Sequence, residues 1–135
     1  MWTTEHSMET TVAPEAIWRL WADVERWPQW NADIERIELR GPFATGSTIA
    51  MTPRGQETVE LRLTEVAEGE RFVDEADLDN TVLRTMHRIE RLGDGRMRVV
   101  YRLAATGPAA RDLGPAVSAD FDETIAALVA RAADC

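Results

Sequence analysis

Four of the chain's five tryptophans lie close together, on either side of a helix-breaking proline at position 28. Each indole combines a large apolar ring with a single N–H that needs a hydrogen-bond acceptor when it is buried. Leucine and isoleucine fill an ordinary helix core, so several indoles around Trp27-Pro28 indicate a pair of short helices that closes a hollow. The four residues are Trp18, Trp21, Trp27 and Trp30.

The length and composition are those of one folded domain over residues 1–135. A chain of this length buries roughly two thirds of the surface that it exposes when unfolded, and its apolar content of 44% is typical of globular proteins. The first residues lack the basic and apolar segments of a signal peptide, and no apolar run is as long as a membrane span. We therefore expect a cytoplasmic protein without membrane insertion.

The charge and the reactive residues exclude several classes of function. A formal net charge of -9 disfavours nucleic acid and anionic membranes as partners, because both require a basic surface. All 15 basic residues are arginine, so a lysine Schiff base is excluded. The single cysteine, Cys135, is the last residue, which leaves no internal disulfide. No spacing typical of a metal site, a nucleophilic serine or a phosphate-binding loop occurs, so we expect no metal and no cofactor.

The hydrophobic pattern changes from strand to helix, to strand and back to helix along the chain. Residues 2–12 favour a first strand, and Pro14 suits the first turn of a helix that Trp27-Pro28 interrupts. Alternation and turn signals then predict a meander of about six antiparallel strands. These strands are expected over residues 34–39, 48–52, 56–66, 71–78, 81–92 and 96–106.

The end of the chain has the pattern of one long amphipathic helix. Apolar residues recur there at steps of three and four, and Asp120 is expected on the outer, polar side. Gly114-Pro115 predicts a kink or restart near the beginning of this helix. The apolar stripe consists of Leu113, Val117, Phe121, Ile125, Leu128 and Val129.

This order of elements resembles the START/Bet v 1-like (SRPBCC) superfamily, and more narrowly its branch of bacterial polyketide cyclase/dehydrase and lipid-transport proteins. The matching motifs are Asp23-x-x-x-Trp27-Pro28-x-Trp30, His87-Arg88-Ile89-Glu90 and Thr106-Gly107-Pro108. The resemblance implies an α+β helix-grip fold, in which a curved antiparallel sheet of six to seven strands wraps around the long C-terminal helix. Two short helices follow the first strand, and a cavity separates the sheet from the long helix.

Alternation in the last two strands places His87 and Tyr101 on the inner face as cross-strand neighbours. Arginines occupy the opposite faces of both strands, which marks those faces as solvated. His87 could move a proton and Tyr101 could stabilise an oxyanion, so both are candidate catalytic residues. The alternative is a buried polar pair with a purely structural role.

Further side chains are candidates for the cavity wall. Trp27 and Trp30 lie beyond the predicted helix and are expected at the cavity mouth, whereas Trp18 and Trp21 are expected in the core. Phe72 and Asp74 share a face of their strand, although the pattern there is ambiguous. The predicted ligand-binding set is Trp27, Trp30, Phe72, Thr85, His87, Tyr101, Leu103 and Phe121.

Three functional hypotheses follow. In the first, the protein binds a small hydrophobic or aromatic ligand in the cavity, as a monomer or homodimer. In the second, which the family resemblance suggests, it is a polyketide cyclase/dehydrase-like enzyme that promotes aldol cyclisation or dehydration. In the third, it is a non-catalytic module that binds a partner through its acidic surface. An apolar cavity is implied by the whole chain, whereas catalysis depends on two residues, so we favour the first hypothesis.

Overall fold

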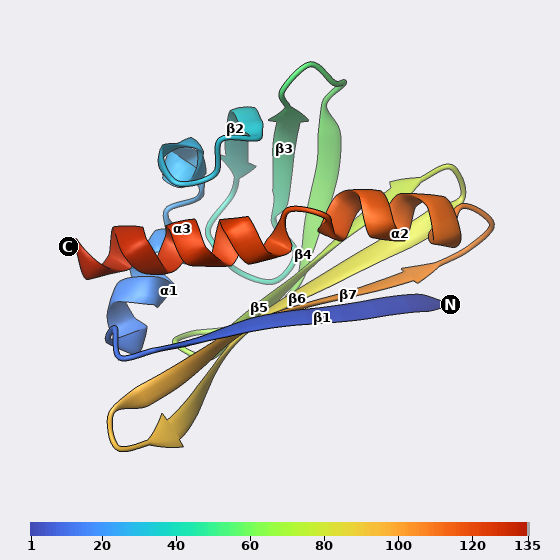
Figure 1. Cartoon of the computed structure of the whole chain (residues 1–135). Coiled ribbons are helices and arrows are strands. Elements are labelled where there is room, and N and C mark those ends of the chain that lie inside the picture. Colours follow the sequence, from blue (N-terminus) through green and yellow to red (C-terminus); the bar gives the residue numbers. More distant parts are fainter. Residues whose placement is uncertain (135) are drawn as a thin grey trace.

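A seven-stranded antiparallel sheet forms most of the fold, which a computed structural model describes for residues 1–134. The sheet has the strand order β1-β7-β6-β5-β4-β3-β2, so β1 and β2 are its two edges (Figure 1). The predicted meander and the first strand are confirmed. The strands are β1 (Trp2–Thr10), β2 (Ile34–Arg40), β3 (Thr48–Pro53), β4 (Val59–Ala67), β5 (Arg71–Leu78), β6 (Thr81–Gly93) and β7 (Arg96–Thr106).

The helices occupy two places in the sequence and lie on the same side of the sheet in Figure 1. The first two, α1 (Pro14–Ala22) and the 3-10 helix η1 (Val24–Gln29), form the predicted short pair after β1. The last two, α2 (Ala110–Ser118) and α3 (Phe121–Ala133), run across the sheet. This is the α+β helix-grip arrangement expected from the sequence. None of the helices within residues 1–134 is long and apolar enough to cross a membrane, and Cys135 lies outside the described residues.

The interruption of the C-terminal helix lies later than the sequence predicts. Helix α2 continues through Gly114 and Pro115, and the break falls between Ser118 and Phe121. The hydroxyl of Ser118 donates a hydrogen bond to the Gly114 carbonyl at 2.9 Å, a local bond that bends helices. The predicted restart at Gly114-Pro115 is therefore wrong, and the break lies instead at Asp120, which lines the cavity.

The C-terminal helices grip mainly one half of the sheet. Helix α2 packs on β1, β6 and β7, and α3 packs on β1, β7 and α1. A bulge between Leu63 and Glu65 in β4 interrupts the register with β5, and bulges bend and twist the strand that carries them. Strands β2 to β4 rise beside the helices in Figure 1. The space between this half of the sheet and the helices is where a cavity can form.

A tight contact fixes the point at which the chain leaves β7 for α2. Gly107 has φ +137°, and an added Cβ would lie 2.6 Å from the Asn80 carbonyl oxygen and 2.7 Å from the Thr81 Cα. The side chain of Thr81 is fully buried, and its hydroxyl oxygen accepts a hydrogen bond from the Ala109 N–H at 2.9 Å. The β5–β6 hairpin and the start of α2 are therefore held together at Gly107.

We expect Gly107→Ala to lower the free energy of unfolding by about 2–4 kcal/mol, because the methyl group meets backbone atoms at a φ that L residues rarely adopt. Gly95→Ala is the matched control, since Gly95 also has a positive φ but no atom lies within 4 Å of its added Cβ. That control should cost only about 1 kcal/mol. Urea unfolding measures the loss of stability in both variants. Equal losses would contradict the tight contact at Gly107.

Candidate functional site

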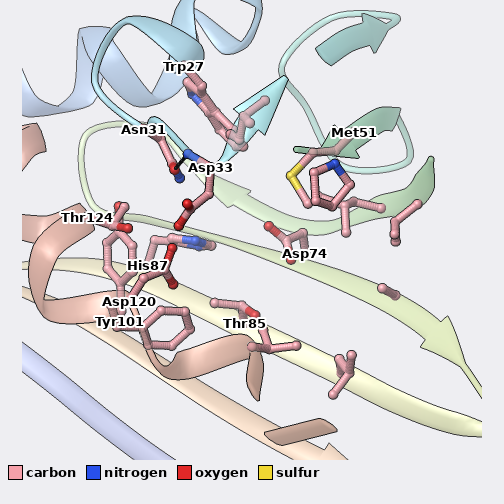
Figure 2. A pocket seen from close by; sticks show the side chains of 18 of the residues that line it. Trp27, Asn31, Asp33, Met51, Asp74, Thr85, His87, Tyr101, Asp120 and Thr124 are labelled. Carbon is pink, nitrogen blue, oxygen red and sulfur yellow. Dashed lines mark hydrogen bonds between the residues drawn. The ribbon is translucent and has the colours of Figure 1, made fainter. Parts of the chain in front are cut away.

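A cavity of about 580 Å³ lies between strands β2 to β7 and the helical elements α1, η1, α2 and α3. Its volume falls within the range of roughly 300–1,000 Å³ that small-molecule sites occupy. Most of its wall is apolar or aromatic, with a few polar groups facing inward (Figure 2). Among the lining residues, the exposed ones mark the mouth: Asp33, Arg54, Gln56, Ala116, Val117 and Ala119.

The tryptophans are distributed differently from the prediction. Trp27 and Trp30 line the cavity, but they are only 6% and 9% exposed and so belong to its wall rather than to its mouth. The Trp27 indole donates a hydrogen bond to the Trp21 carbonyl at 3.0 Å, which holds this ring inward. The indole N–H of Trp30 is buried without an acceptor in residues 1–134. Trp18 packs in the core as predicted, whereas Trp21 lies in the core and also lines the cavity.

Tyr101 is positioned by Trp21 from the opposite side of the cavity. The Trp21 indole N–H donates to the Tyr101 hydroxyl oxygen at 3.2 Å. The Tyr101 hydrogen has no acceptor among the described residues and remains available to a ligand. Burial raises the pKa of Tyr101 above its ordinary value. The residue therefore offers a neutral hydrogen-bond donor inside the cavity.

His87 pairs with Tyr101 across β6 and β7, as the sequence predicts, with ring centroids 4.6 Å apart. Its Nδ1 lies 3.3 Å from the Phe72 carbonyl oxygen, which can only accept, so Nδ1 carries the hydrogen and Nε2 is an acceptor. The His87 ring also stacks on the Phe72 ring, with their centroids 4.0 Å apart. Burial lowers the pKa of His87 to about 3, although the bond to Phe72 opposes this shift. Near neutral pH the ring is uncharged and only weakly basic.

Asp74 is absent from the predicted ligand-binding set, but it lines the cavity. It is 6% exposed and faces the cavity from β5, opposite Thr85 on β6 (Figure 2). No group in residues 1–134 forms a hydrogen bond or ion pair with its carboxyl. Burial, with a smaller contribution from the negative charge of Glu75, raises the pKa of Asp74 to about 7. The alternation of β5 suggested this inward position, but sequence alone could not show that a partner is missing.

A second pair of carboxyls lies at the mouth. Asp120, at the break between α2 and α3, shares a hydrogen bond with Asp33, which precedes β2, and their side chains point towards one another in Figure 2. Burial, followed by the bond to Asp33 and its charge, raises the pKa of Asp120 to about 6. The expected outward position of Asp120 is therefore wrong. Arg54 also lines the mouth, and its Nε donates to the Ala32 carbonyl at 3.2 Å.

All but one of the predicted ligand-binding residues line the cavity. Leu103 is fully buried on β7 but does not line the cavity, so its place in the ligand-binding set is wrong. It packs in the core under the helices, because alternation fixes the inward face but not the part of that face that stays uncovered. Residues 1–134 contain no group of three or more side chains suited to a metal ion. The seven residues that do line the cavity are Trp27, Trp30, Phe72, Thr85, His87, Tyr101 and Phe121.

The fold is similar to that of several solved structures of low sequence identity. A START superfamily protein from Mycobacterium smegmatis superposes with a TM-score of 0.73 at 19% identity, covering 98% of this chain and 97% of that one. Norcoclaurine synthase from Thalictrum flavum superposes with a TM-score of 0.80 at 11% identity, covering 98% of this chain and 94% of that one. The Zhui aromatase/cyclase from Streptomyces sp. R1128 superposes with a TM-score of 0.76 at 13% identity, covering 97% of this chain and 93% of that one.

The family follows from the sequence. The chain belongs to the family described as "Polyketide cyclase / dehydrase and lipid transport", whose sequence model matches residues 1–133. No curated protein sequence matches the chain. At identities below 20%, the structural neighbours establish the fold and not the activity.

We expect Asp74→Asn to stabilise the protein at pH 8 by about 1–4 kcal/mol and to have little effect near pH 4. The pKa of Asp74 in the folded protein, about 7, lies above the ordinary value of 3.8 expected in the unfolded chain, so the stability present below about pH 4 is lost as the pH rises through 7. Removing the carboxyl removes that loss. Thermal unfolding between pH 4 and 8 measures the effect, with the exposed Asp112→Asn on α2 as the control. A gain that does not depend on pH would contradict this account of Asp74.

Proposed function

We propose that the protein, acting as one domain, binds a small aromatic or apolar molecule in the cavity between the sheet and the C-terminal helices. The observation that carries this proposal is the cavity itself, about 580 Å³ in volume and lined mainly by aromatic and aliphatic side chains. Burying a ligand there would release water from this wall, which is the main driving force for apolar binding. The Tyr101 hydroxyl hydrogen and the Asp74 carboxyl, which have no partner within residues 1–134, would orient it.

The comparisons support a ligand-binding role in general terms. The family description combines cyclase, dehydrase and lipid-transport proteins, and the norcoclaurine synthase structure holds a transition-state analogue. These proteins share the helix-grip fold with the present chain. We therefore propose a small hydrophobic molecule as the partner, without assigning its identity.

An enzymatic role is the second candidate, and the environment of Asp74 favours it. A carboxyl with a pKa of about 7 can both accept and release a proton near neutral pH. In this reading Asp74 moves the proton, and the Tyr101 hydroxyl donates a hydrogen bond to the oxyanion that develops. His87 would accept a hydrogen bond from the substrate through Nε2 instead of acting as the base. Turnover of a reactive poly-β-ketone that is lost in Asp74→Asn and in Tyr101→Phe would favour catalysis over simple binding.

The partner-binding hypothesis has no comparable support. It depends on the acidic surface, some of whose carboxylates form ion pairs with neighbouring arginines. Examples are Arg84 with Glu75 at 2.7 Å and Arg62 with Asp77 at 2.9 Å. The cavity therefore remains the better basis for a function.

We expect the neutral dye Nile red to bind in the cavity, enhancing its fluorescence and raising the melting temperature. Thr85→Trp should abolish both effects, because Thr85 faces the cavity and the larger indole would occupy space that the dye needs. Val82→Trp is the matched control, since Val82 lies on the same strand, is 37% exposed and does not line the cavity. Dye binding that survives Thr85→Trp, or none with the wild-type protein, would contradict the proposal.

A further inference from the structure

The cavity contains an excess of carboxyl groups over cations. Asp74 lies deep in the wall, and Asp33 and Asp120 lie at the mouth. Among the described residues that line the cavity, Arg54 is the one with a cationic side chain, since His87 is uncharged near neutral pH. An apolar chamber built only for neutral or anionic lipids would gain nothing from this arrangement. A buried carboxylate is costly unless it has a partner of opposite charge.

Asp74 points independently to a ligand group. The Asp33 and Asp120 carboxyls hydrogen bond to each other, whereas the carboxyl of Asp74 has no hydrogen-bond donor or cation in residues 1–134. Asp74 is nonetheless only 6% exposed and faces the cavity (Figure 2). A ligand that fills the chamber would remove the water that can otherwise solvate this carboxyl. The ligand must then supply the missing partner itself.

The aromatic wall suits a cation in the same space. Trp21, Trp27 and Trp30 all line the cavity together with Tyr101. The faces of indole and phenol rings attract a positive charge within about 6 Å, and this attraction strengthens when water is excluded. An ammonium group could therefore pair with Asp74 while its carbon skeleton packs against the rings.

From these observations we propose that the cavity selects ligands that combine an aromatic or apolar body with a protonated amine, with the ammonium group paired to Asp74 and attracted at the mouth by Asp33 and Asp120. This inference rests on the proposed ligand-binding function and specifies its ligand class. It also implies discrimination against carboxylates of the same shape, because a carboxylate beside Asp74 would be repelled.

The selectivity should depend on pH in a defined direction. A cation stabilises the ionised form of Asp74, so amine binding should tighten as the pH rises through the titration of this carboxyl. A neutral analogue should show no such gain. The charged or titratable groups around Asp74 are Glu75, His87 and Tyr101 nearby, Asp33, Arg54 and Asp120 at the mouth, and Glu123 beside Asp120.

Three probes with one ring system test the inference: the amine 2-(2-naphthyl)ethylamine, the alcohol 2-naphthaleneethanol and the carboxylate 2-naphthaleneacetate. At pH 8 we expect calorimetry to show the amine binding at least about tenfold tighter than the alcohol, and the acetate binding more weakly than both. This ratio corresponds to a difference of about 1.4 kcal/mol in binding free energy. Between pH 8 and 5 the preference for the amine should decline towards that of the alcohol.

The variants assign the preference to Asp74. Asp74→Asn should make amine and alcohol bind within a few-fold of each other, whereas Asp112→Asn, which removes a carboxylate outside the cavity, should leave the preference intact. If Asp74→Asn does not fold, the pH dependence of the wild-type protein still decides the question.

The failures of the two proposals are distinguishable. Equal or tighter binding of the alcohol or the acetate, a preference that does not vary with pH, or a preference that survives Asp74→Asn would overturn the amine inference. Continued binding of Nile red would in each case leave the general ligand-binding function in place. If neither Nile red nor any naphthyl probe binds, the proposed function fails and the amine inference fails with it.

Discussion

The hydrogen bond from the Trp21 indole to the Tyr101 hydroxyl, at 3.2 Å, connects the two parts of the molecule that enclose the cavity. Trp21 belongs to α1 and Tyr101 to β7, so the bond fixes the short helices against the sheet. The same indole packs against Phe72 and His87 at centroid distances of 5.3 and 6.0 Å. Because the Tyr101 oxygen accepts from Trp21, its hydrogen remains available to the cavity. One contact thus supports the wall and orients a functional group.

The chemistry of the cavity follows from burial. Low solvent access keeps His87 and Tyr101 uncharged and raises the pKa of Asp74 to about 7. The two members of the pair that sequence reasoning favoured for catalysis are therefore the less reactive groups near neutral pH. The group that titrates near neutral pH is the Asp74 carboxyl beside them, for which the described part of the chain provides no partner. This contrast favours a ligand that brings a donor or a cation.

The sequence predicted the architecture well because alternation and helical periodicity directly reflect which face of each element is buried. It also placed His87 opposite Tyr101, since the tight turn at Asp94-Gly95 fixes the register of β6 and β7. It misplaced Asp120 because the bend at Ser118 depends on a local side-chain bond and not on periodicity. It assigned Leu103 to the ligand because no pattern distinguishes a buried side chain under a helix from one facing a void.

The central claim is that the enclosed space is a ligand chamber, and native mass spectrometry of the protein purified from its own host tests it most directly. The account predicts a second species, heavier by the mass of one small molecule, that disappears under mild activation and is missing in Thr85→Trp. It would be contradicted if the wild-type protein shows only its own mass and takes up nothing from a small-molecule extract of the same host.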